Sequence, residues 1–201
     1  MLNEYIGLCK EECEIISHIP LPSHPDNTNG GGKNLILGRK IRINTTKYLD
    51  VGKNVTICNN ARLLFVDEYK GGCYEPKVTI GDNVFITFNF TLMAAAPIII
   101  HDHVLIASDV MISSENHGMD PEHSKSYADT PLDGKPVEIG EGCWLGEKSM
   151  VMPGVALGKR CIVAAGAVVT KSFPDYSMIA GVPAKCIKTY NHRSHQWEKS
   201  V

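Results

Sequence analysis

Aliphatic residues recur at every sixth position in the last third of the chain. The series runs Ile139, Leu145, Val151, Leu157, Val163 and Val169. A glycine or alanine often follows directly, and a small or modest side chain follows four positions later. Neither the period of a helix nor the alternation of a strand produces this spacing, which is typical of the hexapeptide repeats of a parallel β-helix.

The repeat predicts a narrow three-sided prism. Each hexapeptide would form one short face, and three faces would close a coil of about eighteen residues, with coils about 4.8 Å apart. The aliphatic residue would point inward, and the position four later would accept only a small side chain. The glycine or alanine beside the aliphatic residue would ease a tight turn. Because such coils are stabilised by stacking on their neighbours, many repeats are needed.

The pattern divides the chain into three parts. Residues 35–185 are expected to form an all-β domain, whose repeat shifts phase by two residues at Ile100 and is interrupted twice. The interruptions are a polar loop at 67–76 and an extended loop at 113–136. Because the coils are occupied with stacking, a loop that leaves them is a natural place for function.

The two ends follow other patterns. Residues 1–34 predict a short amphipathic helix, which would pack on the end of the prism, and a loop rich in Pro and Gly. The chain is expected to leave the prism from Met178 onward. Residues 186–201 would then form a polar tail, with Trp197 as its one large apolar group.

Composition agrees with one well-buried domain of 201 residues and 22.0 kDa. A net charge of −2 and a pI near 6.4 give no reason to expect nucleic acid or an anionic membrane as partner. Cys143 and Cys161 occupy the small inward position, and Cys58 occupies a glycine-like position directly after an aliphatic residue. All three are predicted to be small core residues. With no signal peptide at the N-terminus, the seven cysteines predict a reduced, cytoplasmic protein. The longest apolar run, residues 92–100, is too short to span a bilayer.

His117 is the best candidate for chemistry. It stands where the repeat gives way to the extended loop, so its backbone would be anchored while its ring reaches a cleft. A neutral imidazole accepts protons at cellular pH, as a general base must. From chemistry alone, a catalytic base and an ordinary surface histidine are equally favoured. His101, His103 and His123 raise metal binding as a rival, although turn positions are favoured for the first two.

Outward and basic residues suggest a binding surface near the end of the repeat. Trp144 precedes an inward residue, so it should point outward and need a partner, either a ligand or another subunit. Lys171, Lys185 and Lys188 gather where the repeat ends. They are either ordinary solvated lysines or point charges for a phosphate-rich ligand.

Four motifs resemble the C-terminal signature of hexapeptide-repeat acetyltransferases. They lie at residues 142–146, 152–155, 164–171 and 180–185. The resemblance covers roughly residues 80–190. It is closest to the galactoside and maltose O-acetyltransferase group and, within it, to surface-polysaccharide O-acetyltransferases.

This resemblance implies a left-handed parallel β-helix that assembles as a homotrimer. Acetyl-CoA would lie in the groove between neighbouring prisms, and the extended loop would help to form the acceptor pocket. The catalytic histidine of the family corresponds to His117, which would take a proton from the acceptor hydroxyl as it attacks the thioester directly. A backbone N–H near Gly146 and Glu147 would stabilise the oxyanion. No metal is expected.

The resemblance also implies binding residues. For the acceptor it implies Asn89. For the coenzyme it implies Trp144, Gly146, Glu147, Ala165, Gly166, Thr170, Lys171, Lys185 and Lys188. Two positions depart from the family: apolar residues fill 93–96, where the sugar enzymes have an Asp, and Glu147 replaces a small residue. These departures make simple galactosides and maltose poor candidates. The ending at 187–191, with Trp197, resembles acetyltransferases from surface-polysaccharide gene sets, which favours a glycan or nucleotide-linked sugar as acceptor.

Three alternatives to a sugar O-acetyltransferase follow from the same sequence. A xenobiotic acetyltransferase would share the base and the donor, but residues 118–136 lack the Tyr-Pro-Phe run of those enzymes. A zinc carbonic anhydrase on this fold needs a His-x4-His pair, which His117 and His123 do not provide. A scaffold without catalysis would not need His117 beside a full set of coenzyme motifs.

Overall fold

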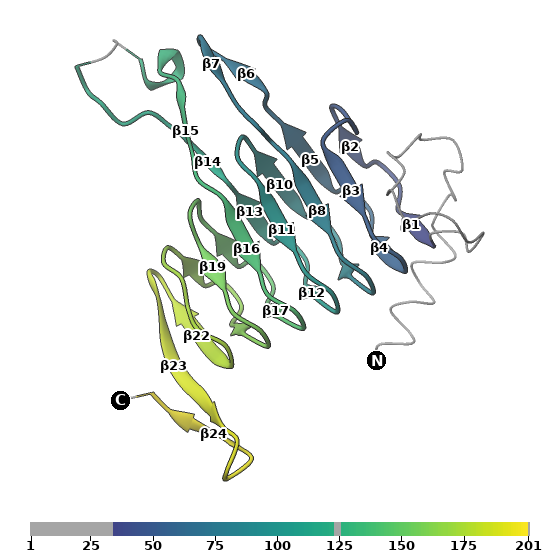
Figure 1. Ribbon diagram of the computed structural model, residues 1–201, viewed down its shortest axis with the longest axis vertical. Helices are drawn as coiled ribbons and strands as arrows, with labels where there is room; N and C mark the ends of the chain where they lie inside the picture. Colours follow the sequence, from purple (N-terminus) through teal and green to yellow (C-terminus); the bar gives the residue numbers. More distant parts are fainter. Residues whose placement is uncertain (1–33, 123–125, 201) are drawn as a thin grey trace.

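The protein is a stack of coils with three flat faces. The computed structural model describes residues 34–122 and 126–200. Along these residues the chain visits three parallel sheets in turn and then returns to the first sheet one strand further along (Figure 1). Each coil therefore adds one strand to each face. This arrangement confirms the all-β, parallel architecture that the hexapeptide repeat predicts.

Within the described residues the three sheets contain nine, six and five strands. The first sheet contains β1 (Leu35–Leu37), β4 (Val55–Ile57), β9 (Phe85–Ile86), β12 (Leu105–Ile106), β17 (Trp144–Leu145), β20 (Ile162–Val163), β22 (Ser177–Gly181), β23 (Ala184–Asn191) and β24 (Gln196–Lys199). The second contains β2 (Arg42–Ile43), β5 (Arg62–Phe65), β10 (Thr91–Ala94), β13 (Met111–Ser113), β18 (Met150–Val151) and β21 (Val168–Val169). The third contains β3 (Leu49–Val51), β8 (Val78–Ile80), β11 (Ile98–Ile100), β16 (Val137–Ile139) and β19 (Ala156–Leu157).

The chain turns three corners in each coil. We call the passage from the first to the second sheet the first corner, from the second to the third the second corner, and from the third to the first the third corner. Two β-hairpins leave the stack, both at the second corner (Figure 1). They are β6 (Glu68–Tyr69) with β7 (Gly72–Cys73), and β14 (Glu115–His117) with β15 (Leu132–Gly134). The 3₁₀ helix η1 (Tyr127–Asp129) lies between β14 and β15.

The core consists of inward side chains stacked in register. On the first sheet Ile86 pairs with Ile106, Ile106 with Leu145, and Leu145 with Val163. All four side chains are completely buried. Because burial of such a side chain contributes about 1.5–3 kcal/mol, these columns are the main source of stability.

The coils are not uniform in length. Ile80 pairs with Ile100, twenty residues later, whereas Ile139 pairs with Leu157, eighteen residues later. In the longer coils, strands β8 and β11 of the third sheet have three residues and bury two side chains each, whereas β19 has two residues and buries one. The prediction of coils of about eighteen residues is therefore confirmed from Ile139 onward, whereas the coil from Ile80 to Ile100 is two residues longer. The longer strands account for the phase shift at Ile100.

The glycine after the aliphatic residue serves close packing and not the turn. A Cβ on Gly146 would lie 2.6 Å from the carbonyl oxygen of Val163 in the next coil. The turn itself falls two residues later, at Lys148 with a φ of 58°. Only a residue that tolerates this left-handed conformation suits the corner. Equivalent corner positions hold Asn54, Asn60, Asn83, Asn89, Asp109, Gly142 and Gly166. The predicted role of the glycine in easing the turn is wrong.

The position four after the aliphatic residue is not restricted to small side chains. Phe90 follows Ile86 by four positions and is completely buried. In the stack it lies between Ala61 of the preceding coil and Val110 of the following one. Because Ala61 is small, it leaves room for the ring. Later coils hold Ser149 and Ala167 in this slot, as the sequence predicts.

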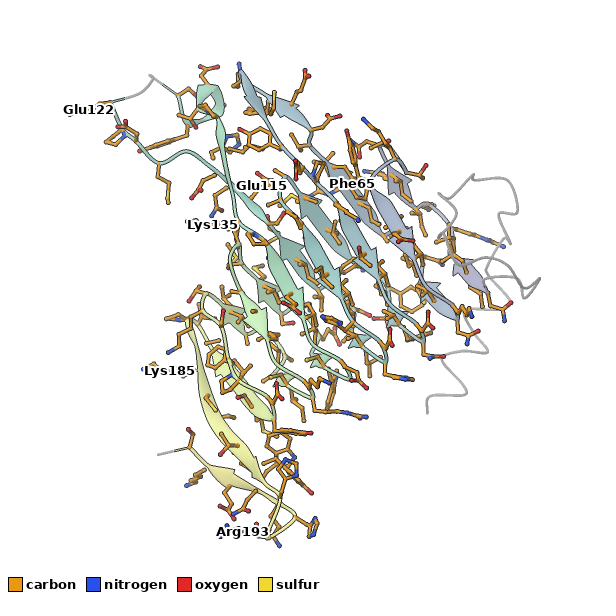
Figure 2. All side chains as sticks on the ribbon, viewed as in Figure 1. Phe65, Glu115, Glu122, Lys135, Lys185 and Arg193 are labelled. Carbon is orange, nitrogen blue, oxygen red and sulfur yellow. The ribbon has the colours of Figure 1, made fainter. Side chains whose placement is uncertain are left out.

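The structure tests the predicted C-terminal exit from the prism but not the predicted N-terminal segment. Residues 1–33, and with them the predicted N-terminal helix, lie outside the described residues. The chain does not leave the prism at Met178, because this residue pairs in parallel with Ile162. Strands β23 and β24 then extend the first sheet as an antiparallel hairpin with Arg193 at its tip (Figure 2). Within residues 34–122 and 126–200, no helix is long and apolar enough to cross a membrane.

Replacing Phe90 tests the packing of the corner slot. Phe90→Ala is expected to lower the free energy of unfolding by about 3–5 kcal/mol, because the neighbouring coils cannot close the cavity. Ser149→Ala is the matched control in the equivalent slot. The Ser149 hydroxyl is buried without a partner among the described residues, so its loss should be neutral or stabilising. Urea unfolding measures both changes. Equal stability losses would contradict this description of the slot.

Candidate active site

His117 has a fixed backbone and an exposed side chain. It is the last residue of β14 and lies opposite Leu132 of β15 in the antiparallel pair. The next residue, Gly118, donates its N–H to the carbonyl oxygen of Pro131 at 2.8 Å. The hairpin therefore holds the backbone of His117 on both sides, while its imidazole remains open to solvent.

The root of this hairpin is tied to the preceding coil by a buried serine. The Ser114 hydroxyl donates to the carbonyl oxygen of Ala96 at 2.7 Å and accepts the Ala96 N–H at 3.0 Å. The Ser114 carbonyl oxygen accepts the N–H of Lys135 from the returning strand at 2.8 Å. Figure 2 shows Glu115 and Lys135 near this root and Glu122 far out along the loop. The hairpin thus departs from a rigid corner.

The far part of the loop folds back toward His117. The buried Thr130 hydroxyl lies 3.1 Å from the carbonyl oxygen of Gly118 and 2.6 Å from that of Tyr127. Ser126 caps the 3₁₀ helix by accepting the N–H of Ala128 at 3.2 Å. These bonds place helix η1 beside the segment that carries the histidine. His123 lies outside the described residues.

The polar loop at 67–76 lies against this hairpin, which sequence reasoning missed. The ring of Tyr69 contacts the His117 imidazole in a T-shaped arrangement, with 5.5 Å between the ring centroids. The one signal in the sequence was the presence of two tyrosines, Tyr69 and Tyr74, in an otherwise polar loop.

Several predicted coenzyme residues gather on the first sheet and at the first corner. Trp144 points outward as predicted, with 48% of its surface exposed. It lies in register between Leu105 and Ile162 on the outer face of the sheet. Ala165 and Gly166 are exposed at the first corner of the next coil.

The two predicted oxyanion donors differ in availability. Gly146 is buried and donates its N–H to the carbonyl oxygen of Val163 at 2.8 Å, so this group is already used within the stack. Glu147 is exposed, and among the described residues its N–H has no backbone acceptor. Of these two positions, Glu147 is the one that can offer a backbone donor to a ligand.

The remaining coenzyme residues are polar and largely exposed. Thr170 and Lys171 follow β21 at the second corner, and the Lys171 ammonium lies 5.6 Å from the centroid of the Phe173 ring. Lys185 and Lys188 lie on β23, opposite Ala180 and Met178 of β22. Figure 2 shows Lys185 where the C-terminal hairpin of β23 and β24 meets the prism.

Asn89, the predicted acceptor ligand, occupies the first corner with a φ of 59°. Its amide nitrogen donates to the Asp109 carboxylate at 2.9 Å, and its amide oxygen accepts from the side chain of Asn60 at 3.1 Å. His117 leaves the prism at the second corner. A single chain therefore divides the predicted site residues between two corners and does not bring Asn89 to His117.

The buried cysteines are core residues, as predicted. Cys143 and Cys161 lie in adjacent coils with at most 1% of their surfaces exposed, and Cys58 is equally buried. The hydrogen bond with Cys161, together with burial, raises the pKa of the Cys143 thiol. The same hydrogen bond lowers the pKa of the Cys161 thiol.

Two of the histidines that suggested a metal site, His101 and His103, lie beside a carboxylate and at a corner of the prism. His101 lies 2.7 Å from a carboxylate oxygen of Glu138, and His103 occupies the third corner with a φ of 60°. Within residues 34–122 and 126–200, no group of three or more His, Cys, Asp or Glu side chains is placed to hold a metal ion.

Comparison with known proteins agrees with this architecture. Residues 136–171 match the model described as the hexapeptide repeat of succinyl-transferase. The chain is 38% identical over 129 residues to WbbJ of Escherichia coli K12, a putative lipopolysaccharide biosynthesis O-acetyl transferase, covering 61% of the chain and 66% of WbbJ. It is 32% identical over 124 residues to the galactoside O-acetyltransferase of the same organism, covering 62% and 60%.

A solved structure extends the similarity to the fold. A hexapeptide-repeat acetyltransferase of Vibrio cholerae, crystallised with acetyl coenzyme A, superposes with a TM-score of 0.58 at 26% identity, over 70% of each chain. The chain is therefore similar, over part of its length, to members of the hexapeptide-repeat acetyltransferase family. It spans 66% or less of the length of the two Escherichia coli members of this family.

The corner position of Asn89 leads to a prediction on stability. Asn89→Gly and Asn89→Ala both remove the side-chain bonds to Asn60 and Asp109. Only alanine also suffers the left-handed backbone, which costs about 1–2 kcal/mol. Urea unfolding should therefore show a larger loss for Asn89→Ala than for Asn89→Gly. Equal losses would mean that the corner relaxes and that its conformation is not required.

Proposed function

We propose that the protein is an acetyl-CoA-dependent O-acetyltransferase that moves an acetyl group to a hydroxyl of a sugar or glycan. The observation that carries the proposal is the exposed imidazole of His117 on a hairpin fixed to the prism. The names of the relatives support the reaction, since two of them are called O-acetyltransferases and one is solved with acetyl coenzyme A.

His117 acts as general base in this proposal. A ring nitrogen accepts the proton of the acceptor hydroxyl while the oxygen attacks the carbonyl carbon of the thioester. The tetrahedral oxyanion accepts a hydrogen bond from the Glu147 N–H. When the C–S bond breaks, the CoA thiolate takes the proton back from His117, which leaves O-acetylated acceptor and CoA. No acyl-enzyme forms, so the buried thiols take no part.

The division of the site between two corners supports a site shared by neighbouring subunits. His117, Thr170 and Lys171 belong to the second corner, whereas the other coenzyme residues belong to the first sheet, its C-terminal hairpin and the first corner. A groove between two copies would unite them. An outward row of apolar side chains on the first sheet offers a surface for such contact: Phe85, Leu105, Trp144, Ile162 and Met178. We include in the proposal the homotrimer and left-handed winding of the family.

The acceptor is proposed to be a glycan or a nucleotide-linked sugar. WbbJ and a second relative, WcaF of Escherichia coli K12, carry names that refer to lipopolysaccharide and colanic acid biosynthesis. The apolar residues at 93–96 support an acceptor other than a simple galactoside. A xenobiotic acceptor would use the same base, but the names favour a sugar. The free thiols among the described residues fit the proposed cytoplasmic location.

Removing the base tests the proposed reaction. With acetyl-CoA and a panel of sugars, glycans and nucleotide-linked sugars, His117→Ala should lower kcat about 10²–10⁴-fold, because the acceptor hydroxyl loses its base. Release of the CoA thiol measures the rate. His195→Asn, at an exposed turn of the C-terminal hairpin where φ is 54°, is the control and should keep full activity. Unchanged activity in His117→Ala, or no thiol release by the wild type with any acceptor, would contradict the proposal.

Mixing two inactive variants tests whether the site is shared. His117→Ala removes the base, and Ala165→Trp fills the proposed coenzyme groove. If each site draws these residues from different subunits, co-expressed chains that assemble at random should regain up to about a quarter of the wild-type activity, averaged over all trimers. Separately purified and unmixed variants serve as the baseline. Failure of mixed trimers to regain activity would place both residues in the site of one chain.

A further inference from the structure

We propose that the segment 67–76, which we call the brace, holds the His117 imidazole in its working orientation, with Tyr69 as the positioning residue. The inference rests on the proposed role of His117 as general base. The brace forms the hairpin β6–β7 and leaves the prism at the second corner, beside the hairpin that carries His117 (Figure 1).

The first observation is the ring contact. The Tyr69 and His117 rings meet at 68° with centroids 5.5 Å apart, within the range of favourable aromatic pairs. The Tyr69 hydroxyl donates to the carbonyl oxygen of Ala128 at 2.7 Å, so both ends of the tyrosine are held. An exposed histidine would otherwise occupy several rotamers. The Tyr69 ring blocks one side of the space that the His117 ring could otherwise occupy.

Two more contacts fix the backbone around His117. The Tyr74 hydroxyl accepts the N–H of Leu132, the residue opposite His117 in the hairpin, at 2.6 Å. Lys70 lies 2.8 Å from a carboxylate oxygen of Asp129 in η1, and this carboxylate raises the pKa of Lys70. Because the pair is exposed, its direct contribution to stability is small. Its effect is to fix where η1 lies.

The brace is itself anchored to the prism. The Tyr48 hydroxyl donates to the Asp67 carboxylate at 2.6 Å, and the Asp67 carbonyl oxygen accepts the N–H of Tyr74 at 2.8 Å. The Tyr48 ring lies 6.4 Å from the buried Phe65 ring at the end of β5. A continuous series of contacts thus runs from the core through the brace to His117.

This arrangement gives the base what its reaction requires. A general base works only within hydrogen-bond reach of the acceptor proton. A misplacement of about 1 Å can lower the rate about a hundredfold. The hairpin β14–β15 fixes the backbone of His117, and the brace supplies the missing restraint on its ring.

Five variants separate positioning from stability. Tyr69→Leu removes the ring, and Tyr69→Phe keeps the ring but loses the bond to Ala128. Tyr190→Leu is the matched control, because Tyr190 makes a similar T-shaped contact with His192 at 5.2 Å in the C-terminal hairpin. Lys70→Ala tests the brace with the ring intact, and Lys159→Ala, which breaks the exposed pair with Glu141, is its control.

Two readouts are measured on the full chain. Tyr69→Leu should lower kcat about tenfold to a hundredfold with an unchanged KM for acetyl-CoA, and Tyr69→Phe should stay close to the wild type. Without substrate, the ring signals of His117, assigned in NMR spectra by their loss in His117→Ala, should shift in Tyr69→Leu but not in Tyr190→Leu. Lys70→Ala should lower kcat less than Tyr69→Leu, and Lys159→Ala should leave kcat unchanged.

The outcomes are distinct. Unchanged kcat and unchanged His117 signals in Tyr69→Leu would overturn the inference, as would a loss of thermal stability alone. The wild type could transfer no acetyl group while the His117 signals still shift in Tyr69→Leu. That result would contradict the proposed function but leave the ring contact established. If Tyr69→Leu does not fold, Lys70→Ala against Lys159→Ala decides the matter, and equal kcat values in these two variants would overturn the inference.

Discussion

In-register stacking of inward aliphatic side chains is the constraint on which the rest of the structure depends. The columns that include Ile86, Ile106 and Leu145 are completely buried, in coils about 4.8 Å apart whose interior is filled by these stacked side chains. Glycines such as Gly146 are required where neighbouring coils approach most closely. Chemistry is therefore confined to the outer faces, the corners and the segments that leave the stack.

The second corner shows how the stack accommodates chemistry. Two segments 59 residues apart in sequence leave the prism there and contact each other, through Tyr69 with Ala128 and Lys70 with Asp129. A regular repeat brings the same corner of successive coils together, so insertions in different coils become neighbours. Most of the proposed coenzyme residues lie instead on the first sheet, its C-terminal hairpin and the first corner, which makes the contact between copies part of the site we propose.

The sequence predicted the features that follow the six-residue repeat and the places where the repeat is interrupted. The repeat of aliphatic residues predicted the parallel sheets, and the slots of Cys143 and Cys161 predicted their burial. The end of the repeat singled out His117. The sequence did not predict the twenty-residue coils, because a two-residue extension of the third sheet resembles a slip of the pattern. Nor did it predict the slot of Phe90, whose size is decided by Ala61 of another coil.

The contact of Tyr69 with His117 could not be predicted, because a pair of loops far apart in sequence has no common period. The sequence pattern also led to the wrong role for the glycines. A glycine is equally expected at a left-handed turn and at a close approach between coils, and the sequence does not distinguish the two. At Gly146 only the distance to the Val163 carbonyl oxygen decided between them.

A crystal structure of the protein with CoA and an accepted sugar would test the account most directly. The account predicts that a ring nitrogen of His117 lies about 2.6–3.2 Å from the hydroxyl that is acetylated. It also predicts that CoA lies between two copies, against Trp144 of one of them, and that Tyr69 still contacts His117. CoA bound away from His117, or a different side chain within reach of the acceptor hydroxyl, would contradict it.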